Sequence, residues 1–148
     1  MNTLTVAPRL DRTVGMGLNG PICVPYAISA LTGVDLRDEM RMAIAGRGLY
    51  APVIHSLIAR VPSLVAVHEV DIDRKLKLMD ALPLSGRGLA WVWEMGARGR
   101  RNGRSTHMLA YDGKLVLDQN DRRLRWVYDD ENWPHAHVLA TYIAREVR

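Results

Sequence analysis

The sequence has no phenylalanine, a single cysteine and only three lysines. One cysteine cannot form an internal disulfide, which fits a thiol-reducing compartment. No stretch approaches the roughly 18 uncharged apolar residues that a membrane span needs. The first residues, MNTLTVAPRLDR, lack the apolar core of a signal peptide. From these absences we expect a cytoplasmic protein with no membrane contact.

The composition is that of an ordinary globular domain. Of the 148 residues, 48% are apolar and 24% are charged. No repeat, low-complexity segment or Gly/Ser/Pro-rich linker divides the chain, so we expect a single domain over residues 1–148. The formal charge of +4, with 17 arginines, permits an acidic partner without demanding nucleic acid.

Helical patterns occupy the first half of the chain. Apolar residues recur at i, i+3, i+4 and i+7 between Val24 and Leu31, which predicts an amphipathic helix ended by Gly33. A strand is expected from Leu64 to Val70. Further helices are expected over residues 36–45, capped by Asp35, over residues 52–60, and from Asp71 or Asp73 to about Leu82.

Strand patterns replace the helical ones from about residue 85 onward. Strands are expected over residues 89–95, 106–111, 114–118 and 124–128, whereas residues 136–146 fit either a strand or a helix. The Gly- and Arg-rich segment 96–105 is expected to form a loop. Helices followed by an antiparallel sheet indicate the α+β class, with the N-terminal helices packed against the C-terminal sheet.

Cys23 lies in the first turn of the best-defined helix. Backbone N–H groups there have no intrahelical partner and the helix dipole is positive, so a thiolate is favoured. At 100° per residue, Cys23 lies about 90° from the centre of the apolar stripe and would border the core, as a residue lining a cleft does. Cys23 is therefore a candidate nucleophile, and a small buried hydrophobe is the alternative.

A hairpin places a histidine beside an acid. Asp112-Gly113 between two alternating runs predicts a two-residue turn, which would put His107 directly opposite Asp118 on one face. A carboxylate in that position fixes the tautomer of the imidazole and stabilises the imidazolium. Asn120 is the alternative orienting residue, and a surface His–Asp pair is the alternative to a catalytic one. A register shift of one residue would move Asp118 to the other face.

The segments NGPICVPYAISALTG, STHMLAYDG and VLD resemble small single-domain members of the papain-like cysteine peptidase superfamily, including bacterial and bacteriophage proteins. The resemblance implies a papain-like fold and a cysteine hydrolase (thiol protease) that acts on an amide bond of a peptide or protein. It implies Cys23 as nucleophile, His107 as general base and acid, and Asp118 as orienting residue. The family has a glutamine before its cysteine that binds the oxyanion. Here Asn19 is the nearest amide, and it would either serve that role with the Cys23 N–H or act as a cap or turn residue.

Two further clusters suggest other functions. In one alternative the chain is a catalytically inactive papain-like binding module, such as a phage accessory protein, that contacts an acidic protein or nucleic acid through Arg98, Arg100, Arg101 and Arg104. In a weaker one, His135 and His137 belong to a metal-dependent hydrolase. We expect neither a cofactor nor a metal, because no phosphate-loop motif and no second ligand cluster accompanies them. The four tryptophans are expected in the core and in cleft walls.

Overall fold

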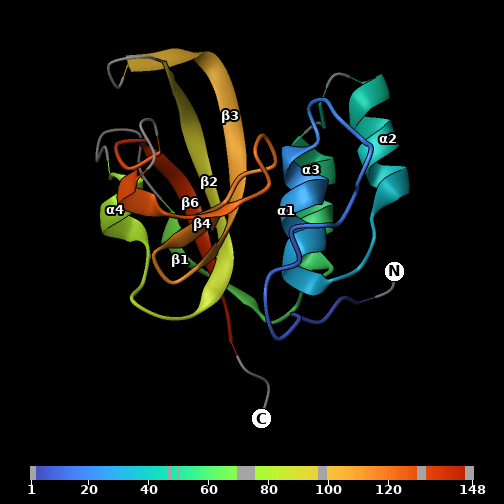
Figure 1. Ribbon diagram of the computed structural model, residues 1–148, viewed down its shortest axis with the longest axis horizontal. Helices are drawn as coiled ribbons and strands as arrows, with labels where there is room; N and C mark the ends of the chain where they lie inside the picture. The colour runs from blue at the N-terminus through green and yellow to red at the C-terminus, as the bar shows by residue number, and fades with distance from the viewer. Residues whose placement is uncertain are drawn as a thin grey trace.

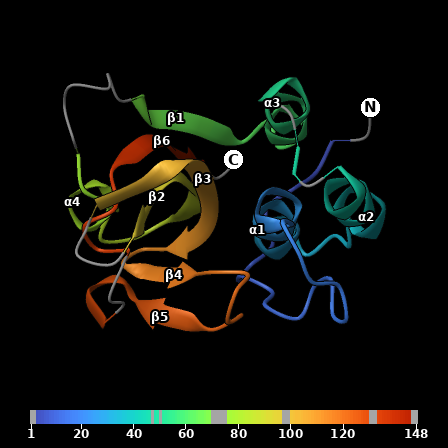
Figure 2. The same cartoon turned by 90° about the horizontal axis from the view of Figure 1, so that it is seen from above.

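The structure is a computed structural model that describes residues 3–46, 48–49, 51–69, 76–96, 100–129 and 133–145. Three helices lie on one side of the molecule and a curved antiparallel sheet lies on the other (Figures 1 and 2). This arrangement confirms the α+β class. The elements are α1 (Cys23–Thr32), α2 (Arg37–Ala45), α3 (Ala51–Ala59), β1 (Leu64–Glu69), α4 (Leu78–Ala81), β2 (Arg87–Gly96), β3 (Arg100–Asp112), β4 (Leu115–Leu117), β5 (Leu124–Trp126), the 3-10 helix η2 (Val127–Asp129) and β6 (Val138–Ala144).

In the described part of the chain, six strands form one sheet in the order β1-β6-β2-β3-β4-β5, with every neighbouring pair antiparallel. The long strands β2 and β3 form its middle, whereas β4 and β5 have three residues each. Because β4 pairs with β3 only from Ala110 to Asp112, it leaves the preceding part of β3 uncovered on that side. His107 lies on this uncovered part of β3.

Helix α1 is the central helix and packs mainly against β3. Every residue from Val24 to Thr32 is buried, so the helix is enclosed all round rather than along one stripe. Gly33 ends it in the left-handed conformation with φ 74°, as the sequence predicts. Among the described residues, no helix is long and apolar enough to cross a membrane.

The two faces of the sheet bury separate apolar clusters. On the helix side, residues of α1, α2 and α3 pack against Leu89 and Met108 of the sheet. On the opposite, concave side of the curved sheet, where α4 lies (Figure 2), Val92 and Leu109 pack with α4 and with Trp133. Alternation along β3 therefore sends successive side chains into different clusters, and His107 shares its face with Leu109. This face is the one that also contains Trp133.

The register of the hairpin differs from the one predicted. The turn consists of Gly113 and Lys114, and Asp112 pairs with Leu115 within the strands. Gly113 has φ 56°, a conformation that favours glycine at the first position of a two-residue turn. Each residue of β4 is thus paired two positions away from the prediction. Because side chains alternate with period two, a shift of two leaves His107 and Asp118 on the same face.

Other predictions were also wrong, including the strand over residues 124–128, which ends at Trp126 and is followed by the 3-10 helix η2. Segment 96–105 is not a loop throughout, because Met95 pairs with Arg101 and Gly96 with Arg100. Asp35 does not cap α2: Leu36 holds the N-cap position, and the Asp35 carboxylate binds Arg37 at 2.9 Å.

The fourth helix is also shorter than expected. It begins only at Leu78, because Leu76 and Lys77 are tied to the chain at the start of β6. The proposed caps Asp71 and Asp73 lie outside the described residues.

Candidate active site

Cys23 is the first residue of α1 and is half-buried. The helix begins without a side-chain cap, and Pro25 has no backbone N–H to leave unsatisfied in the first turn. The thiol lies beside the apolar cluster on the helix side and also lines a cavity. The sequence predicts this border position between core and cleft.

His107 and Asp118 form a buried hydrogen-bonded pair. The distance from His107 Nε2 to Asp118 Oδ1 is 2.8 Å, and the two residues are 3% and 8% exposed. Asp118 follows the last residue of β4, at the point where β4 stops covering β3. The pairing rests on the shared face described above, although the two residues are not directly opposite as predicted.

Asp118 accepts hydrogen bonds through both carboxylate oxygens. Oδ1 also accepts from the backbone N–H of Asn120 at 3.0 Å, and Oδ2 accepts from Trp133 Nε1 at 2.9 Å. Burial raises the pKa of Asp118. The hydrogen bonds with His107, Asn120 and Trp133, together with the charge of His107, nevertheless hold this pKa below the ordinary value of 3.8. The carboxylate is therefore ionised and fixed in orientation at neutral pH.

Trp133 also covers the imidazole. Its ring stacks on His107 with centroids 4.9 Å apart and an angle of 10° between the planes. Trp133 is 8% exposed and belongs to the apolar cluster on the concave side. Sequence reasoning assigned it to the core or a cleft wall and missed its contacts with both members of the pair. It lies 15 residues from Asp118, in an irregular segment where no periodicity gives its position.

The imidazole is protonated more readily than an ordinary histidine. Burial lowers the pKa of His107, but hydrogen bonding with Asp118 and Cys23, and electrostatic attraction to both, raise it to about 10. Cys23 thus acts on the pKa of His107, and the two residues line the same cavity. Because Asp118 engages Nε2, Nδ1 is the ring nitrogen suited to proton exchange with the thiol.

Cys23 and His107 open onto the same cavity, which has a volume of about 450 Å³. One wall is apolar and includes Val24, Leu49 and Ile54, whereas Thr106, Gln119 and Asn120 provide amide and hydroxyl groups. The Gln119 side-chain amide donates to Asn120 Oδ1 at 2.6 Å. A thiol, an imidazole and polar groups thus border a space large enough for part of a substrate.

The two amide residues predicted near the site lie in different places. Asn120 lines the cavity, but only its backbone N–H contacts Asp118, so Asp118 is the residue that holds the imidazole. Asn19 is exposed and does not line the cavity, whereas its neighbours Gly20 and Pro21 do. Asn19 as an oxyanion donor stays a prediction.

The structure describes less of the two other predicted clusters, the arginines and the His135–His137 pair. Arg100, Arg101 and Arg104 lie in β3, and Arg98 lies outside the described residues. A partner bound through these arginines stays a prediction. His135 is exposed, and no group of three potential metal ligands occurs among the described residues.

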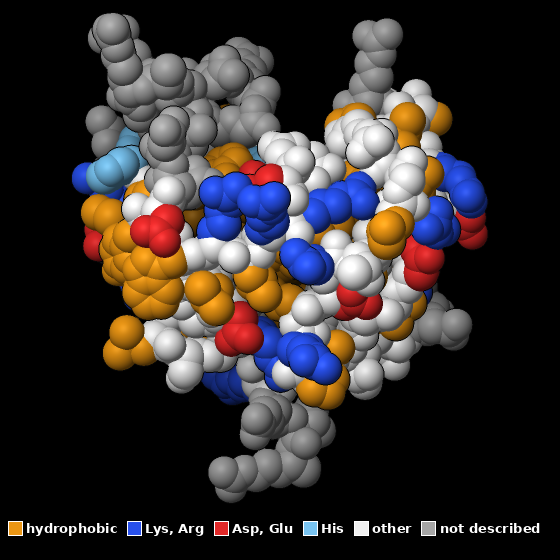
Figure 3. All heavy atoms as spheres, in the orientation of Figure 1, with side chains coloured by type: hydrophobic (Ala, Val, Ile, Leu, Met, Phe, Trp, Pro, Cys, Tyr) orange, Lys and Arg blue, Asp and Glu red, His pale blue; other side chains and the backbone are white. Residues whose placement is uncertain are grey.

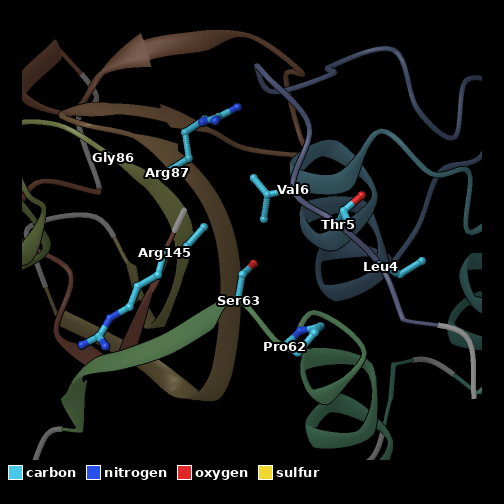
Figure 4. Close-up of a pocket in the computed structure, with 9 residues that line it drawn as sticks. Leu4, Thr5, Val6, Pro62, Ser63, Gly86, Arg87 and Arg145 are labelled. Atoms are coloured by element: carbon cyan, nitrogen blue, oxygen red, sulfur yellow. The ribbon is translucent and has the colours of Figure 1, made fainter. Parts of the chain in front are cut away.

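A second cavity, of about 290 Å³, lies between the N-terminal segment and the sheet (Figure 4). Residues from the N-terminal segment, the start of β2 and the end of β6 line it, including Val6, Ser63 and Arg87. Arg87 donates from Nη1 to the carbonyl of Ala7, and Arg145 points away from Ser63 and Val6. With neither cysteine nor histidine in its lining, this cavity offers no nucleophile–base pair.

Comparison of the chain with protein-family models, curated proteins and solved structures gives no match.

Proposed function

We propose that the protein is a cysteine hydrolase of papain-like type that cleaves an amide bond in a peptide or protein. The observation that carries the proposal is the buried His107–Asp118 hydrogen bond beside a cavity that both His107 and Cys23 line. A carboxylate that orients an imidazole beside a thiol is the arrangement that activates the thiol as a nucleophile. The order of Cys23, His107 and Asp118 along the chain, on a helix and neighbouring strands, supports the papain-like assignment.

The first half of the reaction transfers the acyl group to sulfur. His107 holds the proton of the Cys23 thiol, and the thiolate attacks the carbonyl carbon of the substrate. The protonated imidazole then donates its proton to the leaving nitrogen as the C–N bond breaks, which leaves a thioester on Cys23. Asp118 stabilises the imidazolium and holds the ring in one orientation.

The second half returns the enzyme to its starting state. His107 takes a proton from water, and the hydroxide adds to the thioester carbonyl. The C–S bond breaks, the acid product leaves and the proton stays on His107 beside the sulfur of Cys23. The position of Cys23 at the start of α1 supports this step, since the positive end of a helix dipole stabilises a leaving thiolate.

The proposal is tested with p-nitrophenyl acetate, which needs no knowledge of the natural substrate. We expect a burst of p-nitrophenol and an acetyl adduct that intact-protein and peptide mass spectrometry locates on Cys23. Labelled casein then tests peptide-bond cleavage. Cys23→Ala is expected to abolish the burst, and His107→Ala to reduce its rate by roughly 10²–10⁴-fold, the usual contribution of a general base.

His68→Ala is the matched control, because His68 lies on β1 at the opposite edge of the sheet from β4 and β5. It should acylate at the rate of the unmodified protein. Acylation of Cys23 that is equally fast without His107 would overturn the proposal, because the thiol would then act without a base.

A further inference from the structure

Arg122 joins the two parts of the chain that form the candidate site. The Asp118–Asn120 segment holds the imidazole and lines the cavity, whereas the chain before α1 leads through Gly20 and Pro21 to Cys23. Figures 1 and 2 show the segment after β4 beside the start of α1. Lys and Arg side chains gather across the middle of the face seen in Figure 3, where the sheet and helix sides meet.

The Arg122 guanidinium contacts the helix side at three points. Nη1 donates to the carbonyl of Gly15 at 3.3 Å, and Nη2 donates to the carbonyl of Leu18 at 2.5 Å. These carbonyls belong to one turn, in which the Leu18 N–H donates to Gly15 O at 3.0 Å. The guanidinium carbon also lies 5.3 Å from the ring centroid of Tyr26, one helical turn after Cys23.

The backbone of Arg122 is tied to the acid at the same time. Its N–H donates to the Asp118 carbonyl at 2.8 Å and closes the turn over residues 119–121. Its φ of 55° makes it the one non-glycine residue in the left-handed region among those that the structure describes. A side chain is uncommon in that region and persists where surrounding contacts fix it. The strained residue is therefore the one whose side chain reaches across to the helix side.

We propose that Arg122 is a positioning residue, which clamps the Asp118 segment to the Gly15–Leu18 turn and so holds His107 in line with Cys23. This inference rests on the proposed function, because it concerns the alignment of the same site. Arginine suits the role, since its planar fork binds two carbonyls and stacks on Tyr26 together, whereas lysine offers a single point of contact. Without the clamp, Asp118 and His107 would move relative to the Cys23 sulfur, and proton transfer between the sulfur and the imidazole would slow.

The test is the rate of Cys23 alkylation by iodoacetamide at neutral pH, measured as adduct mass in the full chain. The chain has one cysteine, so each adduct reports on Cys23. Arg122→Asn removes the guanidinium but keeps a residue that enters the left-handed region readily. Arg122→Lys keeps the charge and loses the fork. Arg123→Asn is the control, because the neighbouring Arg123 is exposed and its backbone N–H bonds only to Asp121.

In the unmodified protein we expect alkylation at neutral pH to be faster than that of a small free thiol, because His107 takes up the proton of Cys23. Arg122→Asn should lower this rate about tenfold or more, since small misplacements of a reacting group have effects of this order. Arg122→Lys should fall between the two, and Arg123→Asn should match the unmodified protein.

Thermal unfolding of each variant separates positioning from stability. A lower melting temperature in both Arg122 variants with an unchanged alkylation rate would overturn the inference, as would two variants that both fail to fold, because Arg122 would then be only structural. If the unmodified protein itself reacts no faster than a small free thiol, the proposed function fails. If it reacts faster and Arg122→Asn reproduces its rate, the inference about Arg122 fails alone.

Discussion

Replacing Trp133 by phenylalanine separates its two contacts with the candidate site. Phenylalanine keeps an aromatic ring stacked on His107, but it removes the Nε1–H that donates to Asp118 Oδ2 at 2.9 Å. A hydrogen bond to a charged group contributes about 1.5–3 kcal/mol, and Asp118 is 8% exposed, so water does not replace the lost donor easily. We therefore expect Trp133→Phe to lower the free energy of unfolding by about 1.5–3 kcal/mol.

Thermal and urea unfolding measure the effect at neutral pH. For a chain of this size the expected loss corresponds to a fall in melting temperature of roughly 3–12 °C. Trp126→Phe is the control, because Trp126 is 46% exposed on the edge strand β5 and its replacement should change stability by less than about 0.5 kcal/mol.

The pH dependence of this difference has a definite sign. The pKa of Asp118 is below 3.8 in the folded protein, so the stability that the carboxylate provides is complete above pH 3.8 and is lost as the pH falls through the lowered pKa. The destabilisation by Trp133→Phe should accordingly shrink in strong acid. Equal losses from Trp133→Phe and Trp126→Phe at neutral pH, or a difference that does not respond to acid, would refute the role given to Trp133.

Two other substitutions test the orientation of the imidazole and the hairpin. Asp118→Asn should slow acylation of Cys23 by p-nitrophenyl acetate by roughly 10²–10⁴-fold, because an amide cannot stabilise the imidazolium as a carboxylate does; an unchanged rate would remove Asp118 from the mechanism. Gly113→Ala should lower the free energy of unfolding, measured in urea, by at least about 1 kcal/mol more than Gly17→Ala does. Both glycines have positive φ, but only a Cβ at residue 113 would meet a backbone atom, the carbonyl oxygen of Leu84, at 2.8 Å. Equal effects would show that the turn tolerates the added atom.

The sequence predicts those parts of the site that depend on periodicity. The apolar spacing after Cys23 and the stop at Gly33 predict α1 within a residue, because both signals are local. The pairing of His107 with Asp118 was also predicted, although the turn residues were not. Moving the strand pairing by two residues keeps every side chain on the same face of the sheet. The prediction therefore required only that His107 and Asp118 share a face, and not the exact register.

The parts that the sequence did not predict depend on contacts between distant segments. Trp133 and Arg122 lie in irregular chain outside the strands, where no spacing rule says what they contact. The segment around Arg100 has the glycine and arginine content of a loop, yet strand pairing across from β2 continues through it. Backbone pairing between two long strands does not require an apolar composition.

A titration of His107 by NMR, in the unmodified protein and in Cys23→Ala, decides most directly whether the sulfur and the imidazole meet. The signal is assigned by its loss in His107→Gln. We expect a pKa raised to about 10 in the unmodified protein and a lower value in Cys23→Ala, because hydrogen bonding with Cys23 and attraction to its sulfur contribute to the increase. The same pKa in both proteins, or a value near the ordinary 6.5 in the unmodified one, would contradict the proposed catalytic pair.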